Sequence, residues 1–177
     1  MKIRFFRFNT YLLLLAATLV AGCKSPEEAK RDKTLAKLRL FLEGERDGAD
    51  NYETVEISGV SLLASRQPFL DEGNVRKAAV LETRDGGFAM QVQYDQHGTF
   101  VLDAISAQYR SRRMIIFSQL SVDKTVTSHW LGAPLIGERI LDGQILFTPN
   151  ATREEAEQIA LGVNNLVKEA KRKSFID

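Results

Sequence analysis

The sequence predicts an α+β fold: a small mixed or antiparallel sheet with two helices packed on one face, preceded by an N-terminal tether helix. Segments in which apolar and polar residues alternate predict strands, and segments with apolar residues three or four apart predict helices. Asp-Gly pairs between alternating segments are typical of hairpins. The resulting order is a strand, a hairpin, a helix, a strand, a hairpin and a helix. This order favours helices that cover one face of a sheet in a single small domain.

The first 22 residues have the organisation of a secretory signal. Three basic residues come first, namely Lys2, Arg4 and Arg7. A short apolar run over residues 11–20 follows, and it is too short to span a membrane comfortably as a helix. We therefore expect this segment to direct export and to be removed.

The end of this segment, Leu19-Val20-Ala21-Gly22-Cys23, resembles the lipobox of bacterial lipoproteins. In that family the chain is cut just before the cysteine, whose thiol is acylated. The resemblance implies cleavage between Gly22 and Cys23, and it makes Cys23 the lipid anchor in the membrane. The alternative is an ordinary buried cysteine beside an ordinary signal. Lys24 replaces the aspartate that favours inner-membrane retention in enteric bacteria, so we expect an outer-membrane protein that faces the periplasm.

Composition limits what the remaining chain can do. Removing residues 1–22 leaves 21 basic and 23 acidic residues, a balance that does not fit a nucleic-acid-binding protein. Acylation of Cys23 leaves no thiol for a disulfide or a metal site. Two histidines, His97 and His129, are too few for most zinc sites. We expect no metal, no cofactor and no small-molecule substrate.

Residues 23–51 are expected to form a lipid-anchored tether with an amphipathic helix. Ser25 and Glu28 fit a capping box, and Pro26 suits the first helical position. Gly44 suits the helix end. The apolar residues that share one helical face are Leu35, Leu38, Phe41 and Leu42. This face packs on the domain, on the membrane surface or on a partner, and polar residues 43–51 form a hinge.

Residues 52–177 are expected to form the α+β domain, and strands dominate its first half. The predicted strands are 54–57, which residues 60–63 extend past Gly59, then 75–82 and 88–94. The last two flank Asp85-Gly86-Gly87, which predicts a hairpin. Pro68-Phe69-Leu70-Asp71 predicts a loop that turns its apolar side chains inward.

The second half of the domain is predicted to contain both helices. We expect a helix over 96–111, a strand covered on both faces over 113–122, a hairpin of 135–140 with 144–147, and a final helix from Thr152. Asp142-Gly143 provides the turn of the hairpin. Glu155 completes a capping box with Thr152, and the basic residues over 168–173 suit a solvated helix end.

An ordered set of short motifs links this domain to a known family. The motifs are Pro68-Phe69-Leu70, the stretch 87–94 running into Gly98-Thr99-Phe100, the stretch 113–117, Ala133-Pro134-Leu135-Ile136, Gly143-Gln144-Ile145 and the stretch 152–156. Across residues 55–168 they resemble the head subdomain of the first periplasmic region of SecD and SecDF, accessory subunits of the bacterial protein-export translocase. The resemblance implies this fold and contact with extended polypeptide. It does not imply proton-driven transport, because one lipid anchor stands in place of the membrane bundle.

The sequence carries no motif that indicates catalysis. We therefore expect no catalytic residue and a non-enzymatic protein. One hypothesis is a module that binds exported polypeptide or components of the Sec translocase, by addition of a strand to a sheet edge. The other is a structural envelope lipoprotein that binds a folded outer-membrane or wall partner. The candidate partner-binding residues are Pro68, Phe69, Leu70, His129, Trp130 and Pro134.

Overall fold

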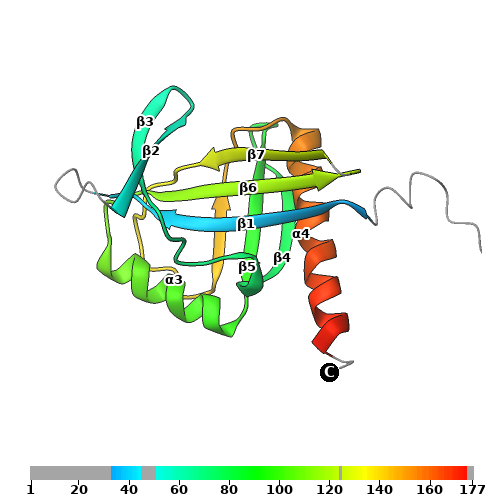
Figure 1. The fold of residues 1–177 in the computed structure, drawn as a ribbon. Helices are drawn as coiled ribbons and strands as arrows, with labels where there is room; N and C mark the ends of the chain where they lie inside the picture. Colours follow the sequence, from blue (N-terminus) through cyan, green and yellow to red (C-terminus); the bar gives the residue numbers. More distant parts are fainter. Residues whose placement is uncertain (1–32, 45–50, 124, 175–177) are drawn as a thin grey trace, which may run out of the picture. The chain divides into compact units, whose positions relative to one another are not determined.

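Two three-stranded antiparallel sheets face each other across the main hydrophobic core of the computed structural model (Figure 1). The structure describes residues 33–44, 51–123 and 125–174. One sheet has the order β1 (Leu35–Leu42), β6 (Met114–Val122) and β7 (Thr125–Gly132). The other has the order β4 (Val75–Glu82), β5 (Phe88–Tyr94) and β8 (Gln144–Phe147). The predicted α+β class is confirmed, with its described strands divided over separate antiparallel sheets.

Three further elements complete the described fold. The predicted extension of the first strand past Gly59 is wrong, because the chain reverses at Ser58-Gly59, where both residues have a positive φ. The two segments, β2 (Tyr52–Ile57) and β3 (Val60–Ser65), instead form a two-stranded antiparallel hairpin. Helix α3 (Gln96–Gln108) follows β5, and helix α4 (Arg153–Ser174) packs against β4 and β1. A short 3-10 turn, η2 (Glu72–Asn74), precedes β4.

The main core follows from the alternation of side chains along the strands. Leu38 and Leu40 of β1, Ile116 of β6, and Met90 and Val92 of β5 are all buried in one cluster. Helix α4 closes this cluster with Ile159, Ala160 and Val163, and α3 adds Leu102. The amphipathic pattern that predicted α4 is therefore the pattern of its contact with the sheets.

The opposite face of the β1-β6-β7 sheet carries a second, smaller core. Phe41 and Ile115 are buried there beneath Val55, Ile57 and Ala64 of the β2-β3 hairpin. Strand β6 is therefore covered on both faces over Met114–Ile116, as its continuous apolar sequence predicted.

The predicted helix over residues 25–44 is wrong in its second half, because Leu35–Leu42 form strand β1. The strand pairs with β6 along its whole length, from Leu35 opposite Ser121 to Leu42 opposite Met114. Lys37 and Arg39 alternate with buried Ala36, Leu38 and Leu40, so a period of two competes with the helical spacing in this segment. Pairing with β6 and burial of the apolar set select the strand. Residues 25–32 of the predicted helix lie outside the described residues.

The first hairpin prediction is confirmed and the second is wrong. β4 and β5 pair around Asp85-Gly86, where Gly86 adopts a φ of +81°. β8 pairs with β5 rather than with residues 135–140. Those residues bond elsewhere: Ile136 N donates to Arg112 O at 2.8 Å, and Ile140 N donates to Ser106 Oγ at 2.9 Å. The Asp142-Gly143 turn therefore comes directly before β8, but it does not join two strands that pair with each other.

Strand β7 was not predicted, because its first residues lack alternating apolar side chains. Thr125 to His129 are exposed, and burial begins only at Trp130, Leu131 and Gly132. The β-branched Thr125, Val126 and Thr127 were the available signal for an edge strand.

Both predicted helices are confirmed, and side chains cap both of their N-termini. Asp95 Oδ1 accepts a hydrogen bond from Gly98 N at 2.7 Å at the start of α3. Thr152 Oγ1 accepts one from Glu155 N at 3.2 Å at the start of α4. These bonds satisfy backbone donors that have no partner within the first helical turn.

A close approach of α4 to β1 gives a stability prediction. A Cβ added at Gly162 would lie 2.6 Å from Ala36 N and 2.8 Å from the Leu35 carbonyl carbon. Alanine favours a helix over glycine by about 1 kcal/mol, but backbone atoms cannot yield as a flexible side chain does. We expect Gly162→Ala to lower the free energy of unfolding by about 1–3 kcal/mol, measured by urea denaturation with Trp130 fluorescence.

Gly137→Ala is the matched control, because a Cβ there meets no atom within 4 Å. Equal stability of the two variants would contradict the close packing of α4 on β1.

Candidate functional site

Three of the sequence-predicted binding residues, Pro68, Phe69 and Leu70, border the outer edge of β1. Leu40 N donates to Leu70 O at 2.9 Å, and Phe69 N donates to Leu40 O at 2.8 Å. Leu70 is buried in the main core and Phe69 packs against it, whereas Pro68 is exposed. The segment therefore covers the backbone of an edge strand, and the inward-facing loop predicted from the sequence is confirmed.

Two others, His129 and Trp130, lie on β7 at the opposite edge of the same sheet. His129 Nδ1 lies 2.7 Å from Glu155 Oε1 in the first turn of α4. The Trp130 ring packs against Phe117 and Phe41, with ring centroids 4.9 Å and 5.6 Å apart. Because β6 separates β7 from β1, the fold places these two residues away from the edge that carries Pro68 to Leu70. The two groups do not form one site.

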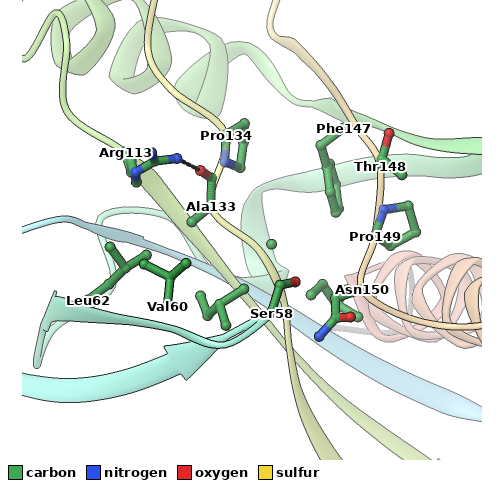
Figure 2. A pocket seen from close by; sticks show the side chains of 13 residues that line it. Ser58, Val60, Leu62, Arg113, Ala133, Pro134, Phe147, Thr148, Pro149 and Asn150 are labelled. Carbon is green, nitrogen blue, oxygen red and sulfur yellow. Dashed lines mark hydrogen bonds between the residues drawn. The ribbon is translucent and has the colours of Figure 1, made fainter.

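The sixth residue, Pro134, lines an open cleft beside the β2-β3 hairpin (Figure 2). The cleft has a volume of about 490 Å³. Val60 and Leu62 of the hairpin lie on one side of it, and Phe147 and Pro149 lie on another. Its charged lining residue, Arg113, donates from Nη1 to Ala133 O at 3.0 Å, so the guanidinium holds the backbone beside Pro134.

Pro134 also lines a second hollow, a groove of about 460 Å³ between β8 and the segment 134–142. Three leucines that line this groove are largely exposed: Leu135 at 58%, Leu141 at 66% and Leu146 at 61%. Several exposed leucines around one hollow form an apolar patch of the kind found at interaction sites, whereas single exposed apolar residues are normal. We call Leu135, Leu141, Leu146 and the hollow between them the leucine groove.

The backbone of β8 offers hydrogen-bonding groups in this groove. Gly143 O accepts from Tyr94 N, and Val92 lies opposite Ile145 in the β5-β8 ladder. In an antiparallel ladder alternate residues direct their N–H and C=O groups at the partner strand, so Leu146 directs its groups away from β5. Among the described residues, no other backbone or side chain bonds to the Leu146 N–H or C=O. The outer edge of β8 is thus open at Leu146, whereas the Gln144 N–H donates to Asp142 Oδ1 at 3.0 Å.

The other edges of the two three-stranded sheets are partly covered or largely polar. Asn164 of α4 pairs with β4, accepting from Ala78 N at 3.0 Å and donating to Ala78 O at 2.8 Å. Phe69 and Leu70 cover β1, as described above. The exposed part of β7 carries one large apolar side chain, Val126. An open edge and several exposed leucines therefore occur together at β8.

Sequence reasoning found Pro134 but missed the leucines. Leu135 and Leu141 were placed in a predicted hairpin with Leu146, and this assignment implied that the two segments covered each other. Their clustering around an Asp-Gly turn was the available signal. The structure separates the segments and opens the groove between them.

The described residues show no constellation for metal chemistry. No group of three or more His, Cys, Asp or Glu side chains converges among them. Among the described residues, no hydroxyl or thiol is hydrogen-bonded to the side chains of His129 and Glu155, since Thr152 Oγ1 accepts from the Glu155 backbone N–H. Burial raises the pKa of the Tyr94 phenol far above its usual range, so this hydroxyl stays protonated inside the core.

Comparison with known proteins identifies the fold. No family model matches the chain, and no curated protein matches it. A solved structure of SecDF, described as a membrane component that enhances protein export, superposes with a TM-score of 0.54 at 16% identity. That match covers 82% of this chain and 70% of the other chain. SecDF in its super-membrane-facing form gives a TM-score of 0.50 at 16% identity, over 81% of this chain and 21% of that one.

The resemblance to SecDF expected from the sequence motifs is therefore confirmed as a likeness of fold. Fold and site together define an α+β domain whose fold is similar to that of the SecDF structures and whose strand β8 is open at Leu146. Among the described residues, neither helix is long and apolar enough to cross a membrane.

The leucine groove gives a prediction that separates exposure from stability. We expect Leu141→Gln with Leu146→Gln to lower the binding of an apolar fluorescent dye, because polar side chains then replace two of the three leucines of the groove. The free energy of unfolding should change by less than about 1 kcal/mol, since both side chains are already exposed. Dye titration and urea denaturation measure the two quantities.

Val126→Gln is the matched control, because Val126 is similarly exposed but lies on β7. Unchanged dye binding in the leucine double variant would show that the groove does not offer an apolar surface.

Proposed function

We propose that this protein is a lipid-anchored envelope protein whose SecDF-like domain binds exported polypeptide without catalysis. The observation that carries the proposal is the open edge of β8 beside the leucine groove. An extended chain can add to such an edge through backbone hydrogen bonds, which do not depend on its sequence. Pockets for alternate side chains then favour segments with apolar residues two apart.

The size and chemistry of the groove support an extended ligand. A hollow of about 460 Å³ lined by three leucines accepts a few apolar side chains. Leu146 presents one N–H and one C=O, the pair of groups that one residue of an added strand would engage. Sheet edges that lack a partner are normally blunted or covered, as β4 and β1 are here, so an uncovered edge favours a binding role.

The anchor and the location of the protein rest on the N-terminal sequence. The signal and the lipobox-like ending support acylation of Cys23 after cleavage behind Gly22. We propose that the mature chain is held at the periplasmic side of the outer membrane. There it meets polypeptides that have left the Sec translocase, or components of that translocase, and uses no cofactor.

The second candidate is a structural lipoprotein with a folded envelope partner. The cleft beside Pro134 favours it, because Val60, Leu62 and Phe147 offer an apolar hollow (Figure 2). Such a partner would form a complex of constant stoichiometry and would not respond to unfolded chains.

Site-specific crosslinking distinguishes the two candidates. We expect a photoreactive residue in place of Leu146, in the full chain in its native membrane, to crosslink many exported polypeptides of different mass. The same residue in place of Phe100 is the matched control, because Phe100 is 72% exposed but lies on α3. Crosslinks should appear at Leu146 and be absent or much weaker at Phe100.

A single crosslinked folded protein at Val60, with nothing at Leu146, would favour the structural lipoprotein instead. Equal crosslinking at Leu146 and Phe100 would show that exported polypeptides do not bind preferentially at the leucine groove.

The anchor has its own test. Cys23→Ser removes the thiol that carries the lipid, so we expect metabolic labelling with a fatty acid to be lost and the variant to keep residues 1–22. Cleavage at Gly22 depends on the lipidated cysteine in the family that the segment resembles. Mass spectrometry of the wild-type chain should show an acylated Cys23 at its N-terminus, and an unmodified thiol there would contradict the assignment.

A further inference from the structure

The last turns of α4 form an exposed basic surface. Lys168, Lys171, Arg172 and Lys173 lie within six residues, with Glu169 as the acidic residue among them. No ion pair or hydrogen bond engages these four cationic side chains among the described residues. Cations at a helix C-terminus are favoured by the helix dipole, but an uncommitted cluster of this size also attracts anionic surfaces.

This surface lies beside the point where the chain enters the domain. Asn165 Nδ2 donates to Thr34 O at 2.9 Å, and both residues are buried. Gly162 packs against the backbone of Leu35 and Ala36. Figure 1 shows the blue start of β1 next to α4. Lys168 follows Asn165 by one helical turn, so the basic turns begin immediately beyond the contact with Thr34.

A cavity of about 550 Å³ extends the basic surface toward β4. Leu166, Val167 and Ala170 of α4 and Val75 of β4 give it apolar walls. Three cationic residues also line it, namely Lys37, Arg76 and Lys171. Apolar walls with cations around them suit an amphiphile that has an anionic head.

The two acidic residues of this cavity are already engaged within the domain. Glu72 accepts two hydrogen bonds from the Arg39 guanidinium, at 3.1 Å and 3.3 Å, and lies 3.6 Å from Lys37 Nζ. Burial raises the pKa of Glu72, but the Arg39 hydrogen bonds, a backbone hydrogen bond and the charges of Arg39 and Lys37 together lower it below its usual value. Asp95 Oδ1 caps α3 through Gly98 N. Arg76 and Lys171 therefore remain for an external anion.

The proposed anchor keeps this surface close to a membrane. Ten residues, 24–33, separate Cys23 from Thr34. A fully extended chain spans at most about 3.5 Å per residue, so Thr34 stays within roughly 40 Å of the lipid-bearing cysteine. Tethering on this scale gives a high effective concentration, so individually weak contacts with the bilayer become significant.

We propose that the basic end of α4 and the adjoining cavity dock on the anionic phospholipid headgroups of the membrane that holds the anchor. This inference rests on the proposed lipid anchor for its geometry, but the charged surface acts without it. Docking through α4 fixes the orientation of the domain at the bilayer. The proposed occupant is a phospholipid surface, and free phosphate is an outcome of the test.

Vesicle binding tests the proposal with the mature chain, residues 23–177, carrying Cys23→Ser so that no acyl chain contributes. We expect the protein to sediment with vesicles that contain phosphatidylglycerol and not with pure phosphatidylcholine vesicles. Lys171→Gln with Arg172→Gln and Lys173→Gln should weaken this binding at least tenfold, because each cation near an anionic bilayer contributes about a fivefold factor. Added salt should weaken it as well.

The matched control neutralises three cations elsewhere, with Arg66→Gln, Arg84→Gln and Arg110→Gln. All three residues are exposed and none lies on α4. Equal losses in the two triple variants would show a non-specific charge effect and overturn the proposal. Binding to both vesicle types, or competition by inorganic phosphate beyond that of chloride at equal ionic strength, would also overturn it.

The outcome is separable from that of the proposed function. An unmodified Cys23 in cells removes the anchor but leaves vesicle binding by the basic surface to be measured. A lack of crosslinks at Leu146 would contradict the proposed polypeptide binding, and it would leave the result of the vesicle sedimentation unchanged.

Discussion

The pairing of β1 with β6 is the interaction on which both hydrophobic clusters depend. Leu38 and Leu40 face the main core from β1, whereas Phe41 faces the smaller core beneath the β2-β3 hairpin. Fully burying one such side chain contributes roughly 1.5–3 kcal/mol, so a strand that buries several on two faces contributes a large share of a marginal stability. The same strand receives α4 through Gly162 and Asn165. Loss of β1 would therefore uncover both cores and release the helix.

This arrangement explains how the fold leaves one edge available. Phe69 and Leu70 bond to β1, and the Asn164 amide bonds to β4, so two sheet edges are covered by the fold itself. The segment after β7 bonds to residues 111–114 instead of to β8. That choice of partner keeps Leu146 uncovered and separates it from Leu135 and Leu141 across the groove. The proposed binding surface thus exists because the segment between β7 and β8 does not pair with β8.

Sequence patterns predicted the elements whose signals are local. The β4-β5 hairpin follows from Asp85-Gly86, and both helices follow from apolar spacing and capping residues. The prediction for β1 was wrong because the segment 35–42 fits both a helical period and a strand period. Its pairing with β6, about 80 residues further along the chain, selects the strand. The leucine groove was not predicted for a related reason, since β8 pairs with the distant β5 and not with the preceding segment. Of the candidate residues, Pro134 lines both hollows, whereas Phe69 and Leu70 bond to β1 and Trp130 packs against aromatic rings.

Amide hydrogen exchange at Leu146 tests strand addition at β8 most directly. Ile145 and Phe147 direct their N–H groups at β5, so these amides should be protected with or without a ligand. Leu146 should exchange fast in the free protein and become protected when an unfolded polypeptide with apolar residues two apart is added. A Leu146 amide that is already protected in the free protein, or that exchanges equally fast with the polypeptide bound, would contradict the account.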